Sequence, residues 1–226
     1  MIGVFDSGVG GLAAINELRK IAKDVDVCFL ADRKNAPYGT KTLGQIIEFS
    51  KRNIERLLSL GAEKILIACC TASAAHPYLS ENEKSASLPI IDLAARRAVE
   101  IANGKRIGVI ATKRTVEEKA FSKAIAKFSH NASVFELETQ EFVSLVEGGA
   151  RDGNLTLNDK RKIARALGPL RDKKIDTLIL GCTHFPHIEK EIQAVTGAKT
   201  VNPALEGALE ISKIANLSGN GRTIYV

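Results

Sequence analysis

The sequence lacks the features that mark membrane and secreted proteins. No apolar run approaches the length that crosses a bilayer. The first residues, MIGVFDSG, begin at once as an apolar strand and have neither a basic region nor room for a signal peptide. We therefore expect a cytoplasmic protein that binds no membrane. Its 226 residues suffice for one large domain or two small ones.

Cysteine is scarce, and its placement does not suggest a disulfide framework. The four cysteines are Cys28, Cys69, Cys70 and Cys182, and a reducing compartment would keep them as thiols. Cys28, within VDVCFL, is typical of a small buried hydrophobic residue. Cys69 and Cys182 differ because each ends an apolar run beside polar groups, as in LILGCTHFP at residues 178–186.

The formal net charge of +6 requires nucleic-acid binding to be considered. The basic residues, however, come in short scattered groups with acidic residues between them, as in EEK at 117–119. This pattern predicts a solvated surface of mixed charge, so we expect no nucleic-acid partner. A mild positive field would draw in an anionic small molecule.

Strand-like and helix-like segments alternate along the chain. We expect strands at 1–5, 25–32, 64–70, 88–93, 106–112, 132–138, 176–182 and 222–226. We expect helices at 13–23, 42–60, 93–102, 115–128, 157–171 and 204–216. The alternation predicts an α/β fold with parallel sheets covered on both faces. The uninterrupted apolar runs ILIAC and LILGC favour central, buried strands.

Two pairs of segments indicate an internal duplication. IGVFDS at 2–7 resembles IGVIAT at 107–112, and ILIACCT at 65–71 resembles LILGCT at 178–183. The second pair leaves open whether Cys69 or Cys70 corresponds to Cys182. We therefore expect two similar parallel-sheet α/β domains that face each other across a cleft. The expected limits are 1–92 plus about 205–226 for the first domain, and 93–204 for the second.

Matching thiols at the carboxyl ends of equivalent strands would lie where open α/β sheets bind ligands. Two bases on opposite faces of one carbon can invert it, because one removes a proton and the other returns one. A thiolate with a lowered pKa serves as the base and a thiol as the acid. Turns rich in Ser, Thr and Gly supply backbone donors for a substrate carboxylate.

Six segments resemble, in order, the motifs of glutamate racemases in the cofactor-independent aspartate/glutamate racemase family: IGVFDSGVGGL, ADRKNAPYG, ACCTASA, IGVIAT, FVSLVEGG and LILGCTHFP. The resemblance runs from residue 2 to about 215, and the combination is specific. It implies two facing α/β domains with the active site in the cleft between them. It also implies interconversion of L- and D-glutamate without a cofactor or metal, a role in peptidoglycan synthesis, and a homodimer.

The resemblance also implies roles for individual residues. Cys69 and Cys182 match the two catalytic cysteines, linked to the D-substrate and L-substrate protons respectively, and Asp6 and His184 match residues that assist proton transfer. The implied substrate contacts are Asp6, Ser7, Tyr38, Gly39, Cys70, Thr71, Glu147, Thr183 and His184.

The chain departs from the family at two places. Cys70 stands where relatives carry an Asn that helps hold the substrate, and a thiol is a weaker donor and acceptor than an amide. Relatives usually continue past the final GRTIYV, and we expect the shorter C-terminus to alter stability or cleft closure. Two alternatives stay open: a racemase for another acidic amino acid such as aspartate, and a non-catalytic relative that only binds a ligand or partner.

Three further motifs have rival interpretations. Cys182, His184 and His187, with Cys69 or Cys70, offer zinc ligands, although CTHFPH lacks the usual paired spacing. The glycines of FDSGVGGL form neither a dinucleotide fingerprint nor a P-loop, which favours a tight strand–turn–helix corner. The tyrosine of APYG is suited both to capping a turn and to presenting donors to a substrate.

Overall fold

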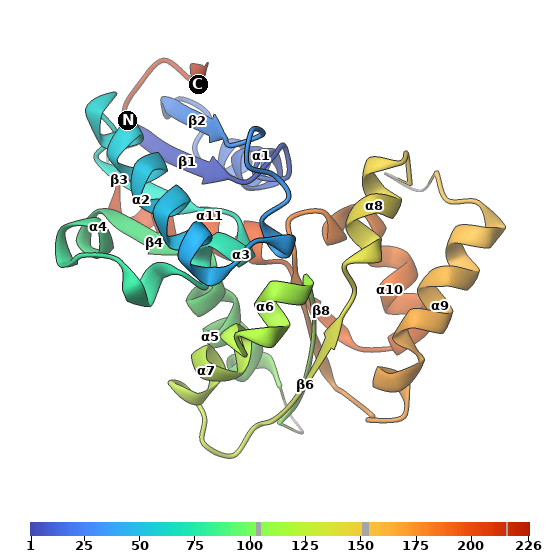
Figure 1. Cartoon of the computed structure of the whole chain (residues 1–226). Coiled ribbons are helices and arrows are strands. Elements are labelled where there is room, and N and C mark those ends of the chain that lie inside the picture. The colour runs from blue at the N-terminus through green and yellow to red at the C-terminus, as the bar shows by residue number, and fades with distance from the viewer. Residues whose placement is uncertain (103–104, 151–153, 216) are drawn as a thin grey trace. The chain divides into compact units, whose positions relative to one another are not determined.

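The computed structural model describes residues 1–102, 105–150, 154–215 and 217–226. These residues divide into two compact units: unit 1 comprises Met1–Leu93 and Pro203–Val226, and unit 2 comprises Ala94–Asn202. Each unit contains one sheet in which all strand pairs are parallel (Figure 1). The predicted α/β class with two parallel-sheet domains is confirmed.

Unit 1 holds the larger sheet, with strand order β4-β3-β1-β2-β9. Its strands are β1 Ile2–Asp6, β2 Val27–Ala31, β3 Lys64–Ile67, β4 Ser87–Pro89 and β9 Thr223–Tyr225. Its helices are α1 Leu12–Ile21, η1 Tyr38–Thr40, α2 Leu43–Ser59, α3 Cys70–Ser73, η2 His76–Tyr78, α4 Glu81–Ala86 and α11 Pro203–Ile214. A further helix, α5, runs from Ile90 to Ile101 and so belongs to both units.

Unit 2 has strand order β6-β5-β7-β8. Its strands are β5 Arg106–Ala111, β6 Ser133–Glu138, β7 Thr177–Gly181 and β8 Lys199–Val201. Its helices are α6 Lys113–Glu117, α7 Ala120–Ala126, α8 Glu141–Glu147, α9 Leu157–Arg171, η3 Phe185–Ile188 and α10 Glu189–Thr196.

The two sheets share one strand order over four strands. The order β4-β3-β1-β2 in unit 1 corresponds to β8-β7-β5-β6 in unit 2, and β9 is an addition on the edge of unit 1. The apolar runs ILIAC and LILGC supply β3 and β7, and both are interior strands, as predicted. The repeated topology supports the internal duplication inferred from the sequence.

Helix α2 illustrates how the sequence sets a local element. The Thr42 hydroxyl accepts a hydrogen bond from Gln45 N at 3.3 Å, and Gln45 Oε1 accepts one from Thr42 N at 3.0 Å. This reciprocal capping satisfies two backbone donors at the start of the helix. Ile46, Ile54 and Leu57 then lie on the buried face at helical spacing.

The prediction of a strand over residues 88–93 is wrong in its second half. Strand β4 ends at Pro89, and helix α5 begins at Ile90. Ile90 N donates a hydrogen bond to the Ser73 hydroxyl at 3.0 Å, and positions 90, 94 and 98 are all buried at helical spacing. The short apolar run therefore belongs mostly to a buried helix. Over so few residues, periodicity alone does not distinguish a buried strand from a buried helix.

The single helix predicted over 115–128 is two helices, α6 and α7. They are separated at Lys119, whose φ of 50° lies in the left-handed region that an α-helix cannot include. Strand β3 is also shorter than predicted, because it ends at Ile67 and the following cysteine caps α3.

Candidate active site

The strand registers determine which residues of the two units correspond. Ile2 of β1 pairs with Lys64 of β3, and Ile107 of β5 pairs with Thr177 of β7. Because Ile2 corresponds to Ile107, Lys64 corresponds to Thr177, which is an offset of 113 residues along the chain.

This offset resolves which cysteines are equivalent. Adding 113 to position 69 gives position 182, so Cys69 and Cys182 follow equivalent strands at the same distance. Cys70 corresponds instead to Thr183, which means that aligning the two Cys-Thr pairs places the repeat one residue out of register. Cys69, Cys70 and Cys182 are buried, with 6%, 2% and 8% of their surface exposed.

Cys69 is the N-cap residue of α3. Its Sγ accepts a hydrogen bond from Ala72 N at 3.4 Å, and its thiol donates to Ser7 Oγ at 3.5 Å. The β3–α3 corner and the β1–α1 corner thus meet at this sulfur. The structure brings together two of the predicted site residues of unit 1, Cys69 and Ser7.

Asp6, the last residue of β1, is fully buried. Its Oδ2 accepts a hydrogen bond from Gly8 N at 2.9 Å, which holds the carboxylate in the turn before α1. A Cβ at Gly11 would lie 2.7 Å from the Asp6 Cβ, so only glycine allows the helix to start this close. The glycine-rich segment is therefore the tight strand–turn–helix corner that the sequence favoured.

The environment of Cys69 opposes its ionisation. Burial raises the pKa of the Cys69 thiol to about 11, and the neighbouring Asp6 carboxylate adds to this increase because two negative charges repel each other. The hydrogen bonds that Cys69 makes with Ser7 and Ala72 lower this pKa and so act in the opposite direction. At neutral pH the sulfur is consequently a thiol, which can donate a proton.

Cys182 of unit 2 lies beside an imidazole. Its Sγ is 3.6 Å from His184 Nδ1, and His184 Nε2 is 3.2 Å from Glu147 Oε1 at the end of α8. Nε2 is buried and the contact lacks hydrogen-bond geometry, so it is a close contact and not a hydrogen bond. Thiol, imidazole and carboxylate thus form a continuous chain. The structure brings all three predicted residues together.

Tyr38 is part of a polar cluster that the sequence did not reveal. Its hydroxyl donates to Asp32 Oδ2 at 2.6 Å and accepts from Asn53 Nδ2 at 3.1 Å. Asn35 Nδ2 donates to both oxygens of Asp32, at 2.8 and 3.0 Å. A hint was available in the sequence, because Asp32 follows β2 just as Asp6 ends the adjacent β1.

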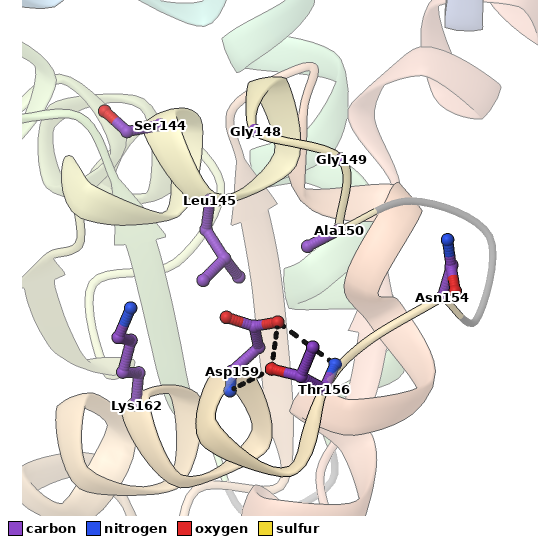
Figure 2. A pocket seen from close by; sticks show the side chains of 9 residues that line it. All are labelled: Ser144, Leu145, Gly148, Gly149, Ala150, Asn154, Thr156, Asp159 and Lys162. Carbon is purple, nitrogen blue, oxygen red and sulfur yellow. Dashed lines mark hydrogen bonds between the residues drawn. The ribbon is translucent and has the colours of Figure 1, made fainter.

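A cavity of about 450 Å³ lies within unit 2, and none of the predicted site residues lines it, although Glu147 directly precedes the lining residue Gly148. It opens between the end of α8 and the start of α9, where Asp159 bonds Thr156 and the Lys162 side chain stands to one side (Figure 2). Its lining residues are Ser144, Leu145, Gly148, Gly149, Ala150, Asn154, Thr156, Asp159 and Lys162. The bonded Thr156–Asp159 pair is the capping box of α9, so these side chains serve the helix.

The described residues offer neither a metal-ligand cluster nor a membrane-spanning helix. Across residues 1–102, 105–150, 154–215 and 217–226, no group of three or more His, Cys, Asp and Glu side chains could hold a metal ion. Within that same part of the chain, no helix has both the length and the apolar character needed to span a bilayer.

The sequence model of one protein family, described as Asp/Glu/Hydantoin racemase, matches residues 15–210. Among curated proteins, the chain is 37% identical to a glutamate racemase of Exiguobacterium sibiricum over 223 residues, which cover 96% of this chain and 80% of that protein. It is 36% identical to a glutamate racemase of Desulforudis audaxviator over 201 residues, covering 88% and 72%.

Solved structures agree with these matches. A glutamate racemase from Bacillus anthracis superposes with a TM-score of 0.89 at 30% identity, covering 100% of this chain and 86% of that one. A glutamate racemase from Francisella tularensis in complex with D-glutamate gives a TM-score of 0.88 at 30% identity, covering 99% and 86%.

Proposed function

Since the chain belongs to the Asp/Glu/hydantoin racemase family and is therefore an amino-acid racemase, an isomerase, we propose that it interconverts L- and D-glutamate. The relatives named glutamate racemase support this substrate, as does the D-glutamate in the Francisella complex. The observation that carries the mechanism is the equivalent placement of Cys69 and Cys182, each beside its own proton-transfer partner.

The reaction needs two proton transfers at one carbon. In the L-to-D direction, Cys182 as thiolate removes the α-proton of L-glutamate and Cys69 as thiol delivers its proton to the opposite face. The product is D-glutamate, Cys182 is left protonated and Cys69 is left as thiolate. The raised pKa of Cys69 supports this assignment, because a thiol that holds its proton at neutral pH is ready to act as the acid.

The partner of Cys182 supports its role as the base. His184 Nδ1 lies 3.6 Å from the sulfur, close enough for the imidazole to take the thiol proton before the substrate is attacked. The carboxylate of Glu147, 3.2 Å from the other ring nitrogen, stabilises the imidazolium that results. We therefore assign Glu147 to the support of His184, in addition to lining the site.

In the D-to-L direction, Cys69 has to lose its proton first. We propose that Asp6 takes it, because this buried carboxylate already influences the pKa of the Cys69 thiol. Once Asp6 is protonated, its charge no longer opposes the thiolate. The same carboxylate thus holds Cys69 in the acid form at rest and assists its deprotonation during turnover.

The substrate contacts are proposed to be largely backbone groups. The Tyr38 hydroxyl is occupied by Asp32 and Asn53, so Tyr38–Gly39 would contribute through their main chain. Ser7, Cys70, Thr71 and Thr183 complete the proposed contacts. Backbone donors suit the carboxylates of glutamate because they are fixed before the substrate arrives.

Several wider properties accompany this proposal. We propose turnover without a cofactor or metal, supply of D-glutamate for peptidoglycan, a homodimer, and a cytoplasmic location supported by four free cysteines. We also propose that the folding domains are 1–92 with about 205–226, and 93–204. Light scattering of the purified protein tests the dimer, and activity after EDTA and hydroxylamine treatment tests the independence from metal and pyridoxal.

Circular dichroism of L-glutamate incubated with the purified protein tests the activity most simply. We expect the signal to decay to zero, and the same decay with opposite sign from D-glutamate. No change with glutamate but decay with aspartate would instead support an aspartate racemase. No change with either amino acid, together with measurable ligand binding, would support a non-catalytic relative. The observation that favours this alternative is Cys70, where the family resemblance led us to expect Asn.

A further inference from the structure

Asp32 is the centre of a buried polar cluster in unit 1, which we call the Asp32 cluster: Asp32, Asn35, Tyr38 and Asn53. The Asp32 side chain is only 8% exposed and accepts bonds from the other three residues. Arg52 Nη2 approaches Asp32 Oδ2 at 3.6 Å from the solvent side. A network in which every member bonds another fixes the orientation of each side chain.

The Asp32 cluster links the two corners that hold the proposed chemistry of unit 1. Asp32 N donates to the backbone carbonyl of Asp6 at 3.0 Å, which ties it to the end of β1. Tyr38 begins η1, and η1 packs against α3, the helix that Cys69 caps. Burial and the bond to Asp32 raise the pKa of Tyr38, and the nearby Cys69 adds to this, so the hydroxyl remains a donor.

Packing alone would keep the Tyr38 ring in place. The ring is 1% exposed and lies 5.5 Å from the Phe49 ring, centroid to centroid. A phenylalanine would bury the same surface without requiring a buried carboxylate, whose desolvation costs free energy. What the hydroxyl adds is therefore orientation, since its bonds to Asp32 and Asn53 tie the start of η1 to the residue after β2 and to α2.

We propose that Asp32 and Asn53 are positioning residues of the racemase, which hold the Tyr38–Gly39 turn against Cys69 so that its backbone meets the substrate. The inference rests on the proposed function, because it assigns the cluster to the same site. None of these side chains needs to touch glutamate. Loosening the cluster should weaken binding of both enantiomers and expose the Cys69 thiol.

The decisive variant is Tyr38→Phe, which removes one oxygen and keeps the ring. The measurements are kcat and KM for both enantiomers, and the rate at which iodoacetamide alkylates Cys69, followed by mass spectrometry. We expect KM to rise about tenfold with kcat within about threefold of wild type, and alkylation to become several-fold faster. A matched control is Ser50→Ala on the same helix as Asn53, because the Ser50 hydroxyl is buried without a hydrogen-bond partner in the described structure. The control should change neither quantity.

Unchanged KM in a folded Tyr38→Phe protein would overturn the proposal, as would loss of kcat alone. Should that variant not fold, Asn35→Ala decides instead: a rise in KM of about threefold supports the proposal, and no rise overturns it. If the wild-type protein does not racemise glutamate, the proposed function fails, and the alkylation rate of Cys69 alone then tests whether the Asp32 cluster positions the Tyr38–Gly39 turn. Faster alkylation of Cys69 in the variant would then support it, and an unchanged rate would overturn it.

Discussion

The two units share a strand order but surround their equivalent thiols with different chemistry. In unit 1 the partner is the buried carboxylate of Asp6, and the corresponding position in unit 2 is Ala111. In unit 2 the partner is the imidazole of His184, supported by Glu147, and the corresponding position in unit 1 is Thr71. The two equivalent sulfurs therefore follow equivalent strands at the same distance, while the polar groups beside them differ.

This difference has a chemical consequence. A carboxylate beside a thiol disfavours the thiolate, whereas an imidazole can accept the thiol proton at neutral pH. The resting enzyme is thus expected to hold an acid in unit 1 and a base in unit 2, which is the arrangement that L-to-D conversion needs. The predictions that follow test whether the two halves really divide the work in this way.

The largest effect is expected from removing either sulfur. Cys69→Ser and Cys182→Ser should each reduce racemisation by at least about a thousandfold, because a serine hydroxyl is a far weaker acid than a thiol and does not ionise near neutral pH to serve as the base. Each single variant should still eliminate HCl from a β-chloro glutamate of one hand, since abstraction needs only one thiolate. Full activity in Cys69→Ser with loss in Cys70→Ser would show that the neighbouring thiol is the catalytic one.

Replacing the two proton partners should separate the halves. Asp6→Asn and His184→Asn are each expected to lower kcat about a hundredfold, as for loss of a proton-transfer group. Because the enantiomers are equal in energy, kcat/KM must fall equally in both directions, so rates alone cannot distinguish the variants. Substrates deuterated at the α-carbon can do so.

The isotope effect should rise with the L-substrate in His184→Asn and with the D-substrate in Asp6→Asn. In each case, abstraction by the affected thiol becomes more rate-limiting. Equal isotope effects for both enantiomers in both variants would contradict the division of labour between the units.

The position after Cys69 tests how substrate contacts differ between the halves. Cys70 is the counterpart of Thr183, and its thiol is a weaker hydrogen-bonding group than the Asn amide that the family resemblance led us to expect there. Cys70→Asn should lower the KM for glutamate about tenfold or more, equivalent to one hydrogen bond to a charged group. An unchanged or higher KM in a folded variant would mean that the site is arranged differently around this residue.

The smallest effect is expected from the carboxylate behind the imidazole. Glu147→Gln removes the charge that we propose stabilises the His184 imidazolium formed during turnover, and it should reduce kcat roughly fivefold, since the side chain is 58% exposed and its charge is partly screened by water. Glu141→Gln, at the other end of α8, is the matched control and should leave kcat unchanged. Equal effects of the two substitutions would mean that general charge matters and the contact does not.

The sequence was a good guide where signals are local and contiguous. Long apolar runs predicted β3 and β7 as interior strands, and the helix predicted over residues 157–171 is α9, which Thr156 and Asp159 cap. The sequence was a poor guide where only a few residues determine whether a segment is a strand or a helix. Strand β8 has only three residues, and the run that starts α5 is too short to show its period.

The residues of the candidate site likewise fall into those that local motifs predicted and those that only the fold brings together. Motifs predicted Cys182, His184 and Glu147, which the fold brings into one chain of contacts. The Asp32 cluster could not be predicted, because Asp32 and Asn53 are 21 residues apart and meet only once α2 packs on the sheet. The correspondence of Cys69 with Cys182 likewise required the strand register, since the repeated Cys-Thr pairs suggest the wrong alignment.

The central claim is that two different groups handle the proton on the two faces of glutamate. Incubation of L-glutamate with wild-type enzyme in D₂O, stopped early and analysed by separating the enantiomers, tests it directly. Two-base chemistry predicts that newly formed D-glutamate carries deuterium at the α-carbon while the remaining L-glutamate retains its proton. Deuterium appearing equally in both enantiomers from the start would indicate a single base that exchanges with solvent, and would contradict the account.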